Sequence, residues 1–138
     1  MPNCSIFKGL SKRVLIVEDN EDNFELVRFL LERAGYVVLS ASNGMDGVDA
    51  AIRELPDLIL MDLSLPELDG WDATTRIKAS MKTRHIPVFA LTAHTLPSDR
   101  VRAIEAGCDG YISKPIKVAS FDRLVATLLR QAQAGLSA

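Results

Sequence analysis

Apolar residues occur along this chain in two patterns, short continuous runs and longer stretches in which they recur every three or four positions. Short runs bounded by turn residues are typical of buried strands, and the recurring pattern is typical of helices that bury one face. The two patterns alternate, which predicts βαβ units around a parallel sheet. The predicted strands lie at 13–17, 36–40, 57–61, 86–91 and 109–113, and the predicted helices at 20–34, 44–54, 70–80, 97–106 and 117–131.

The first and last predicted helices each carry one apolar stripe that is expected to pack on the sheet. In the first helix, which Gly35 is predicted to end, the stripe consists of Asn23, Leu26, Val27, Leu30, Leu31 and Ala34. In the last helix it consists of Phe121, Leu124, Val125, Leu128 and Leu129. Phe29 lies far from the centre of the first stripe and Phe24 about a quarter turn from it, so both aromatic rings are expected at or near the surface.

Polar residues follow four of the apolar runs, at the point where each strand ends. In a parallel sheet the carboxyl ends of the strands form one edge, and the crevice outside that edge is where such sheets bind ligands. The side chains expected to converge there are Glu18 and Asp19, Asp62, Thr92 and Lys114. Asp62, which follows the buried run 58–61, is therefore predicted to have a chemical role.

Three carboxylates on one edge repel one another unless a cation or protons offset their charge. Hard oxygen ligands with open water positions suit Mg²⁺, so the edge is a candidate magnesium site. Taken singly, each residue of the set is equally well explained as a turn former or a helix cap. Their occurrence together favours a site.

The composition is that of an ordinary globular domain. The 138 residues suit one domain, with 48% hydrophobic and 25% charged residues. A net charge of −2 gives no support to direct nucleic-acid binding, and no apolar run suits a membrane span or a signal peptide, so we expect a cytoplasmic protein. Cys4 and Cys108 cannot form a disulfide framework, and His85 and His94 are too few for a zinc site.

Four short motifs occur in an order and spacing that are highly specific when taken together. They are Val-Glu-Asp-Asn at 17–20, Leu-Met-Asp-Leu at 60–63 followed by Pro66 and Gly70, Leu-Thr-Ala at 91–93, and Tyr-Ile-Ser-Lys-Pro at 111–115. With these motifs the chain resembles the receiver domains of two-component response regulators, over residues 12 to about 131.

The resemblance implies an α/β fold of the flavodoxin-like kind, a doubly wound five-stranded parallel sheet in the order 2-1-3-4-5 flanked by five helices. Residues 1–11 would then be a flexible tail, 12–131 the receiver domain and 132–138 a second short tail. Because no second-domain pattern is seen, the chain is expected to be a stand-alone receiver.

The resemblance also implies that Asp62 is the residue that is phosphorylated, in a reaction that depends on Mg²⁺. Asp19 and Asp62 would bind the metal directly, the backbone carbonyl of Ser64 would add a ligand, and Glu18 would act through water. Receivers often carry Asp where this chain has Glu18, and the longer side chain leaves water-mediated binding intact.

Three further roles follow from the same resemblance. Lys114 would bind a phosphoryl oxygen, and Thr92 would donate its hydroxyl to another oxygen once its loop moves inward. Tyr111 occupies the switch position, where the ring turns inward as Thr92 is drawn toward the phosphate. The ordinary alternatives stay open: an exposed lysine without a function for Lys114, and a half-buried strand aromatic for Tyr111.

The expected function is that of a phosphoacceptor signalling protein, not an enzyme in the usual sense. It would take a phosphoryl group from a histidine kinase or a histidine phosphotransfer protein and would bind an unknown downstream protein when phosphorylated. Phe24 and Phe29 are candidate contacts for the phosphodonor. In the stretch 107–116 the chain is similar to cell-division regulators of the DivK type, although receivers of hybrid kinases share such stretches.

Two other functions stay open. A Mg²⁺-dependent phosphatase of the haloacid dehalogenase type also uses an aspartyl nucleophile, but its Asp-x-Asp pattern follows the first strand, whereas Asp62 follows the third. A flavodoxin-like flavin binder shares the sheet order. In this chain, however, the acidic stretch 18–22 follows the first strand and would repel a flavin phosphate.

Overall fold

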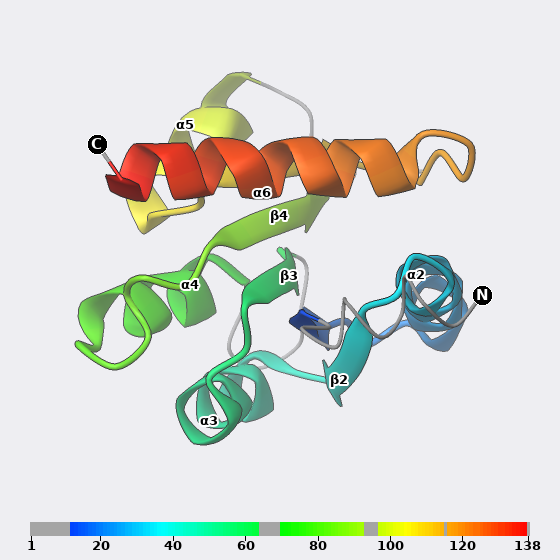
Figure 1. Cartoon of the computed structure of the whole chain (residues 1–138). Coiled ribbons are helices and arrows are strands. Elements are labelled where there is room, and N and C mark those ends of the chain that lie inside the picture. Colours follow the sequence, from blue (N-terminus) through cyan, green and yellow to red (C-terminus); the bar gives the residue numbers. More distant parts are fainter. Residues whose placement is uncertain (1–11, 64–69, 93–96, 115, 138) are drawn as a thin grey trace.

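The computed structural model of the chain describes residues 12–63, 70–92, 97–114 and 116–137, in which strands alternate with helices (Figure 1). The strands are β1 (Arg13–Val17), β2 (Val37–Ala41), β3 (Leu58–Asp62), β4 (Val88–Thr92) and β5 (Gly110–Ser113). The helices are α2 (Glu21–Arg33), α3 (Gly44–Glu54), α4 (Gly70–Ala79), α5 (Pro97–Ala106) and α6 (Phe121–Ser137).

All strand pairs are parallel, and the five-stranded sheet has the order β2-β1-β3-β4-β5. This confirms the predicted fold class and sheet order. The chain moves from β1 outward to β2 and then returns to place β3 on the other side of β1, so the order reverses between β1 and β3. Ligands of doubly wound sheets bind at such a reversal, outside the carboxyl ends of the strands.

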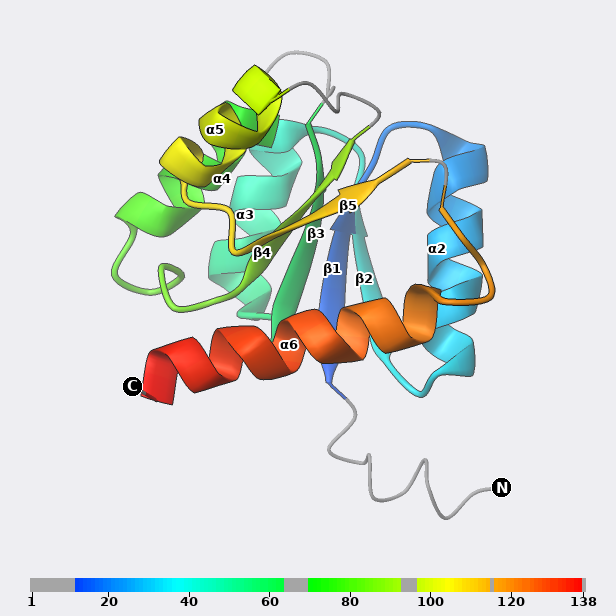
Figure 2. The same ribbon diagram turned by 90° about the horizontal axis from the view of Figure 1, so that it is seen from above.

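The sheet is covered on both faces, which explains why its central strands are continuously apolar. α2 and α6 pack on one face, and α3 and α4 pack on the other, with α5 beside α4 (Figure 2). Successive residues of a strand point to opposite faces. In β1, Val14 and Ile16 therefore belong to the core under α2 and α6, whereas Leu15 and Val17 belong to the core under α3 and α4.

Two asparagines begin the helices that flank the reversal point. The side chain of Asn20 accepts a hydrogen bond from the Asn23 N–H at 2.9 Å, and Asn43 caps α3 in the same way at 2.8 Å from the Asp46 N–H. A cap of this kind satisfies a backbone donor that the first helical turn leaves free. Gly35, with φ of 98°, follows the end of α2, as the sequence predicts.

The last helix differs most from its prediction. The sequence predicts a helix over 117–131 and a tail over 132–138, but α6 runs from Phe121 to Ser137. It begins late because Ser120 stands at the cap position, where its carbonyl accepts a hydrogen bond from the Leu124 N–H at 3.0 Å. It continues further because 131–137 is rich in Ala, Gln and Leu, which favour helix.

The buried stripe of α6 is narrower than predicted. Phe121, Val125 and Leu129 are buried, whereas Leu124 is 37% exposed.

The strand β4 begins two residues later than predicted, because Pro87 has no N–H to give to the sheet. Among the helices of the described ranges, none is both long and apolar enough to cross a membrane.

Candidate functional site

Three carboxylates meet at the carboxyl edge of the sheet, where the strand order reverses. β1 and β3 are neighbours with Val17 opposite Met61, so the residues that follow Val17 lie beside Asp62. Oxygen atoms of Glu18, Asp19 and Asp62 all lie within 4.8 Å of one another. We call these three residues the acidic cluster; its predicted convergence is confirmed.

The members of the acidic cluster differ in exposure. Glu18 is 4% exposed and Asp62 is 3% exposed, whereas Asp19 is open to solvent. The Glu18 carboxylate accepts a hydrogen bond from the Asn20 backbone N–H at 3.3 Å, so the residue that caps α2 also holds this carboxylate in place. Two buried carboxylates and one exposed one therefore share a small volume.

Among the described residues, the Lys114 side chain is the cation that faces the acidic cluster. The Lys114 ammonium donates to Glu18 Oε1 at 3.1 Å and lies 3.4 Å from Asp62 Oδ2. Strand pairing places it there, because Ser113 lies opposite Thr92 and the Lys114 backbone N–H donates to the Thr92 carbonyl at 2.8 Å. With all groups ionised, three negative charges face one positive charge.

The Glu18 carboxyl responds both to its burial and to the neighbouring negative charge. Its pKa is raised from 4.5 to about 7, first by burial and then by a hydrogen bond and charge repulsion with Asp62. Lys114 acts in the opposite direction and lowers the pKa, but it does not cancel the other effects. A carboxyl group whose pKa is raised in this way is partly protonated near neutral pH. A further positive charge close by would favour its ionised form.

Two other predicted site residues, Thr92 and Tyr111, lie on β4 and β5. Thr92 ends β4 and is buried, one residue beyond Leu91, which lies opposite Asp62. Tyr111 lies opposite Ala90 and is half buried in a small apolar cluster with Leu63, Trp71 and Cys108. Its packing agrees with that of a half-buried strand aromatic, and its switch role stays a prediction. Ser64 lies outside the described residues.

The sequence did not predict the close packing of Gly70 behind Asp62. A Cβ atom on Gly70 would lie 2.2 Å from the Asp62 carbonyl oxygen, so the first residue of α4 rests directly on the backbone of β3. The ion pair of Lys114 with Glu18 was also not predicted, because Lys114 was assigned to the phosphoryl group alone. The motifs bring these residues together, but the contacts themselves depend on how the elements pack.

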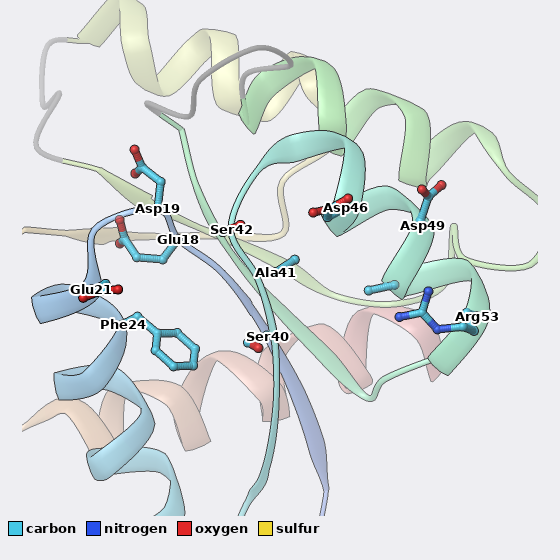
Figure 3. A pocket seen from close by; sticks show the side chains of 11 residues that line it. Glu18, Asp19, Glu21, Phe24, Ser40, Ala41, Ser42, Asp46, Asp49 and Arg53 are labelled. Atoms are coloured by element: carbon cyan, nitrogen blue, oxygen red, sulfur yellow. The ribbon is translucent and has the colours of Figure 1, made fainter.

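A cleft of about 510 Å³ opens beside the acidic cluster, between the start of α2, the end of β2 and α3 (Figure 3). Glu18 and Asp19 lie at one side of the cleft and Arg53 of α3 at the other. The Phe24 ring extends into it from α2 and is half buried, while Phe29 on the same helix is 59% exposed. Glu18 and Asp19 of the acidic cluster thus line a cleft that small molecules can enter from this side.

Known proteins with a similar sequence or structure share this arrangement of elements. The family model described as "Response regulator receiver domain" matches residues 14–128. The polar-differentiation response regulator DivK of Brucella anthropi is 44% identical over 123 residues, which are 89% of this chain and all of that protein. DivK of Brucella ovis is 43% identical over the same length.

Solved structures agree. The receiver domain of the sensor histidine kinase PA1611 from Pseudomonas aeruginosa, crystallised with a magnesium ion coordinated in its active site cleft, is 38% identical with a TM-score of 0.80; the match covers 86% of this chain and 98% of that one. The Vibrio cholerae chemotaxis protein CheY4 is 26% identical with a TM-score of 0.79, over 87% and 98% of the two chains. By its match over most of its length, this chain belongs to the response regulator receiver domain family.

Proposed function

We propose that the chain accepts a phosphoryl group on Asp62 from a histidine kinase or a histidine phosphotransfer protein, and that the phosphorylated form signals by binding a downstream protein. One observation carries this proposal. Asp62 is a buried carboxylate at the reversal point of the sheet, 3.4 Å from the Lys114 ammonium and beside two further carboxylates.

The acidic cluster fits Mg²⁺. Its donors are hard carboxylate oxygens within 4.8 Å of one another, and burial together with the neighbouring Asp62 raises the pKa of Glu18. Asp19 and Asp62 would hold the ion directly and Glu18 through water; the Ser64 carbonyl, which is not among the described residues, stays a predicted ligand. A bound Mg²⁺ would offset the charge of the phosphoryl oxygens and keep them in line with the nucleophile.

In the proposed reaction an oxygen of Asp62 forms a bond to phosphorus. The bond from phosphorus to the donor's histidine nitrogen breaks, and the electron pair leaves with that nitrogen. Lys114 then pairs with a phosphoryl oxygen instead of with the free carboxylates, and the buried Thr92 hydroxyl donates to another oxygen. Because Glu18 and Asp62 are almost fully buried, little bulk water surrounds the attacking group.

Transmission of the signal is proposed to run through β4 and β5. Thr92 and Lys114 are joined by the hydrogen bond between their backbones, so a displacement of Thr92 toward the phosphate acts directly on β5. Tyr111 lies on β5, and its ring shares the apolar cluster of Leu63 and Trp71. The proposed inward turn of Tyr111 would therefore repack a small cluster and leave the main cores unchanged.

The proposed docking surface for the phosphodonor lies on α2. Phe29 is 59% exposed, with the Arg33 guanidinium 5.5 Å from its ring centre, and Arg33 also lies 3.8 Å from the Asp122 carboxylate of α6. Phe24, half buried in the cleft, offers less surface and is expected to contribute less. The class of the phosphodonor, the binding of a downstream protein and the cytoplasmic location stay predictions.

The test is the intact mass of the protein after incubation with acetyl phosphate and Mg²⁺. We expect wild type to gain one phosphoryl group, and Asp62→Asn, which keeps the shape but lacks the carboxylate nucleophile, to gain none. Asp57→Asn is the matched control, since Asp57 precedes the same strand at its opposite end, where it accepts from the Arg13 N–H at 2.8 Å. Equal gains in Asp62→Asn and wild type would disprove the assignment of Asp62.

A further inference from the structure

Gly70, the first residue of α4, lies so close to the backbone of Asp62 that a residue with a side chain could not take its place. A Cβ atom at this position would lie 2.2 Å from the Asp62 carbonyl oxygen and 2.6 Å from the Leu63 Cα. Contacts of a Cβ atom below 3.0 Å are essentially never seen. Since both obstructing atoms belong to the backbone, neither can rotate away, and a side chain would force the strand and the helix apart.

Two hydrogen bonds hold Gly70 in this position. Its N–H donates to the Leu63 carbonyl at 3.3 Å, and its own carbonyl accepts from the Thr74 hydroxyl at 2.7 Å. Thr74 is fully buried, and the Cys108 thiol before β5 lies 4.0 Å from the same hydroxyl. The first bond ties the start of α4 to the residue that follows β3, directly behind Asp62, and the second lies within α4 and holds the Gly70 carbonyl.

We propose that Gly70 is a positioning residue for phosphoryl transfer, and that Thr74 assists it. The missing side chain lets α4 rest on the peptide between Asp62 and Leu63, and this fixes the backbone from which the Asp62 carboxylate extends. The inference rests on the proposed role of Asp62 as phosphoacceptor. It adds that the reaction rate depends on a contact made on the far side of the nucleophile's backbone, by residues that do not touch the phosphoryl group.

The expected effect follows from the sensitivity of such reactions to alignment. To bring a Cβ atom from 2.2 Å to an ordinary contact, the backbones of α4 and β3 must separate by about 1 Å, and a misplacement of that size at Asp62 can slow a reaction by about 100-fold. Gly70→Ala is therefore expected to slow phosphorylation by acetyl phosphate by about 10- to 100-fold at saturating Mg²⁺ and acetyl phosphate.

Gly47→Ala is the matched control. Gly47 is also a buried glycine near the start of a helix, and its Cβ atom would lie 2.9 Å from a methyl group of the Val17 side chain. Both variants crowd a helix against the sheet, but only Gly70→Ala presses on the backbone of Asp62. Rates are normalised to the folded fraction, taken from denaturant unfolding, and we expect Gly47→Ala to stay within about twofold of wild type.

A second pair keeps the test decisive even when Gly70→Ala does not fold. Thr74→Val removes the hydroxyl that holds Gly70, and Thr75→Val removes an equivalent hydroxyl that donates to the Trp71 carbonyl at 3.0 Å on the exposed side of α4. We expect Thr74→Val to slow phosphorylation about threefold, which corresponds to about 0.7 kcal/mol in the barrier. We expect Thr75→Val to leave the rate unchanged.

The outcomes separate the inference from the function on which it rests. Slower reaction of folded Gly70→Ala and of Thr74→Val, relative to their controls, supports the positioning role. Wild-type rates in folded Gly70→Ala, or equal rates in the two threonine variants, overturn it. A wild-type protein that gains no phosphoryl group overturns the proposed role of Asp62 itself, and with it the reaction that Gly70 would serve.

Discussion

Two lysines of this domain are 18% exposed and contact carboxylates, yet their surroundings differ in kind. At the amino edge of the sheet, Lys78 donates to the Asp109 carboxylate at 2.8 Å and to the carbonyls of Arg84 and Ile86 at 3.1 and 2.6 Å. An ammonium has three N–H groups, and here each has one acceptor. One positive charge meets one negative charge.

At the carboxyl edge, Lys114 faces Glu18 and Asp62 at 3.1 and 3.4 Å, with Asp19 close by. Here one ammonium contacts two of three neighbouring carboxylates, and the pKa of Glu18 rises to about 7 because of its burial and its neighbours. The comparison teaches that a lysine beside a carboxylate is not itself a sign of function. The pair of Lys78 and Asp109, whose charges cancel, joins α4 to the starts of β4 and β5. The group of Lys114 and the acidic cluster keeps a net negative charge and can take up a cation or a proton.

The largest effect is expected when a carboxylate is removed from the unbalanced edge. Asp19→Asn should weaken Mg²⁺ binding by about 100-fold, because the exposed carboxylate is the one that an incoming ion meets without displacing Lys114; this corresponds to about 2.7 kcal/mol. Isothermal titration with Mg²⁺ measures the loss. Asp109→Asn should bind Mg²⁺ as wild type does, and an equal loss in both variants would contradict the assigned metal ligands.

A second test compares how much each of the two lysines contributes to the stability of the fold. Lys78→Met should reduce the free energy of unfolding by about 2 kcal/mol, since it leaves the Asp109 carboxylate and two carbonyls without their donor. Lys114→Met should cost less than about 1 kcal/mol, because Glu18 can take up a proton in place of the lost cation. Urea unfolding at pH 7 compares the two variants with wild type.

The same two variants should show the reverse order in signalling. Trp71, the single tryptophan of the chain, shares an apolar cluster with Tyr111, so its fluorescence can report a rearrangement there. Phosphorylation should change this fluorescence in wild type and in Lys78→Met but not in Lys114→Met. A normal fluorescence response in phosphorylated Lys114→Met would show that this lysine does not read the phosphate.

The third prediction concerns pH. The pKa of Glu18 in the folded protein, about 7, exceeds its ordinary value of 4.5, so the folded state holds the proton more tightly than the unfolded chain. The stabilisation is fully present below about pH 4.5 and is lost as the pH rises through 7. Without Mg²⁺, wild type should lose about 2 to 3 kcal/mol more than Glu18→Gln between pH 5 and pH 8.

Urea unfolding across this range measures the difference, and Mg²⁺ should remove it by supplying the missing positive charge. Parallel stability curves for wild type and Glu18→Gln without Mg²⁺ would show that Glu18 is ionised throughout. The net negative charge of the acidic cluster would then be offset by something other than protonation of Glu18.

The smallest effect is expected away from both edges, on the exposed face of α2. Phe29→Ala should slow transfer from a cognate histidine phosphotransfer protein by about threefold, because it removes apolar docking surface, and should leave the reaction with acetyl phosphate unchanged. Met81→Ala is the control, since Met81 is 79% exposed on another part of the surface. Equal slowing with both donors would indicate damage to the fold.

The fold and the acidic cluster could be predicted because both depend on short-range patterns. Continuous apolar runs mark the buried strands, and parallel strands bring their carboxyl ends to one edge, so residues at the ends of runs, such as Asp62 and Lys114, must converge. The burial of Val27, Leu30 and Leu31 in α2 follows equally from helical spacing.

The remaining contacts depend on how elements pack, which no local pattern records. Glu18 and Lys114 are 96 residues apart in the chain, and Lys78 and Asp109 are 31 apart. Whether a lysine contacts one carboxylate or two is decided by the order of the strands and by the position of each residue along them. The contact of Gly70 with Asp62 was hidden for the same reason, since a glycine in a helix start has many ordinary uses.

The most direct test of the central claim is to locate the phosphoryl group on the chain. Wild-type protein is treated with acetyl phosphate with and without Mg²⁺, the acylphosphate is reduced with borohydride to mark its residue, and tandem mass spectrometry identifies the marked peptide. Because the carboxyl edge carries net negative charge, we expect a single labelled residue, Asp62, and we expect its labelling to depend on Mg²⁺. A mark on Asp109 or another balanced carboxylate, or the same labelling of Asp62 without Mg²⁺, would contradict the claim that excess negative charge at the carboxyl edge makes this site reactive.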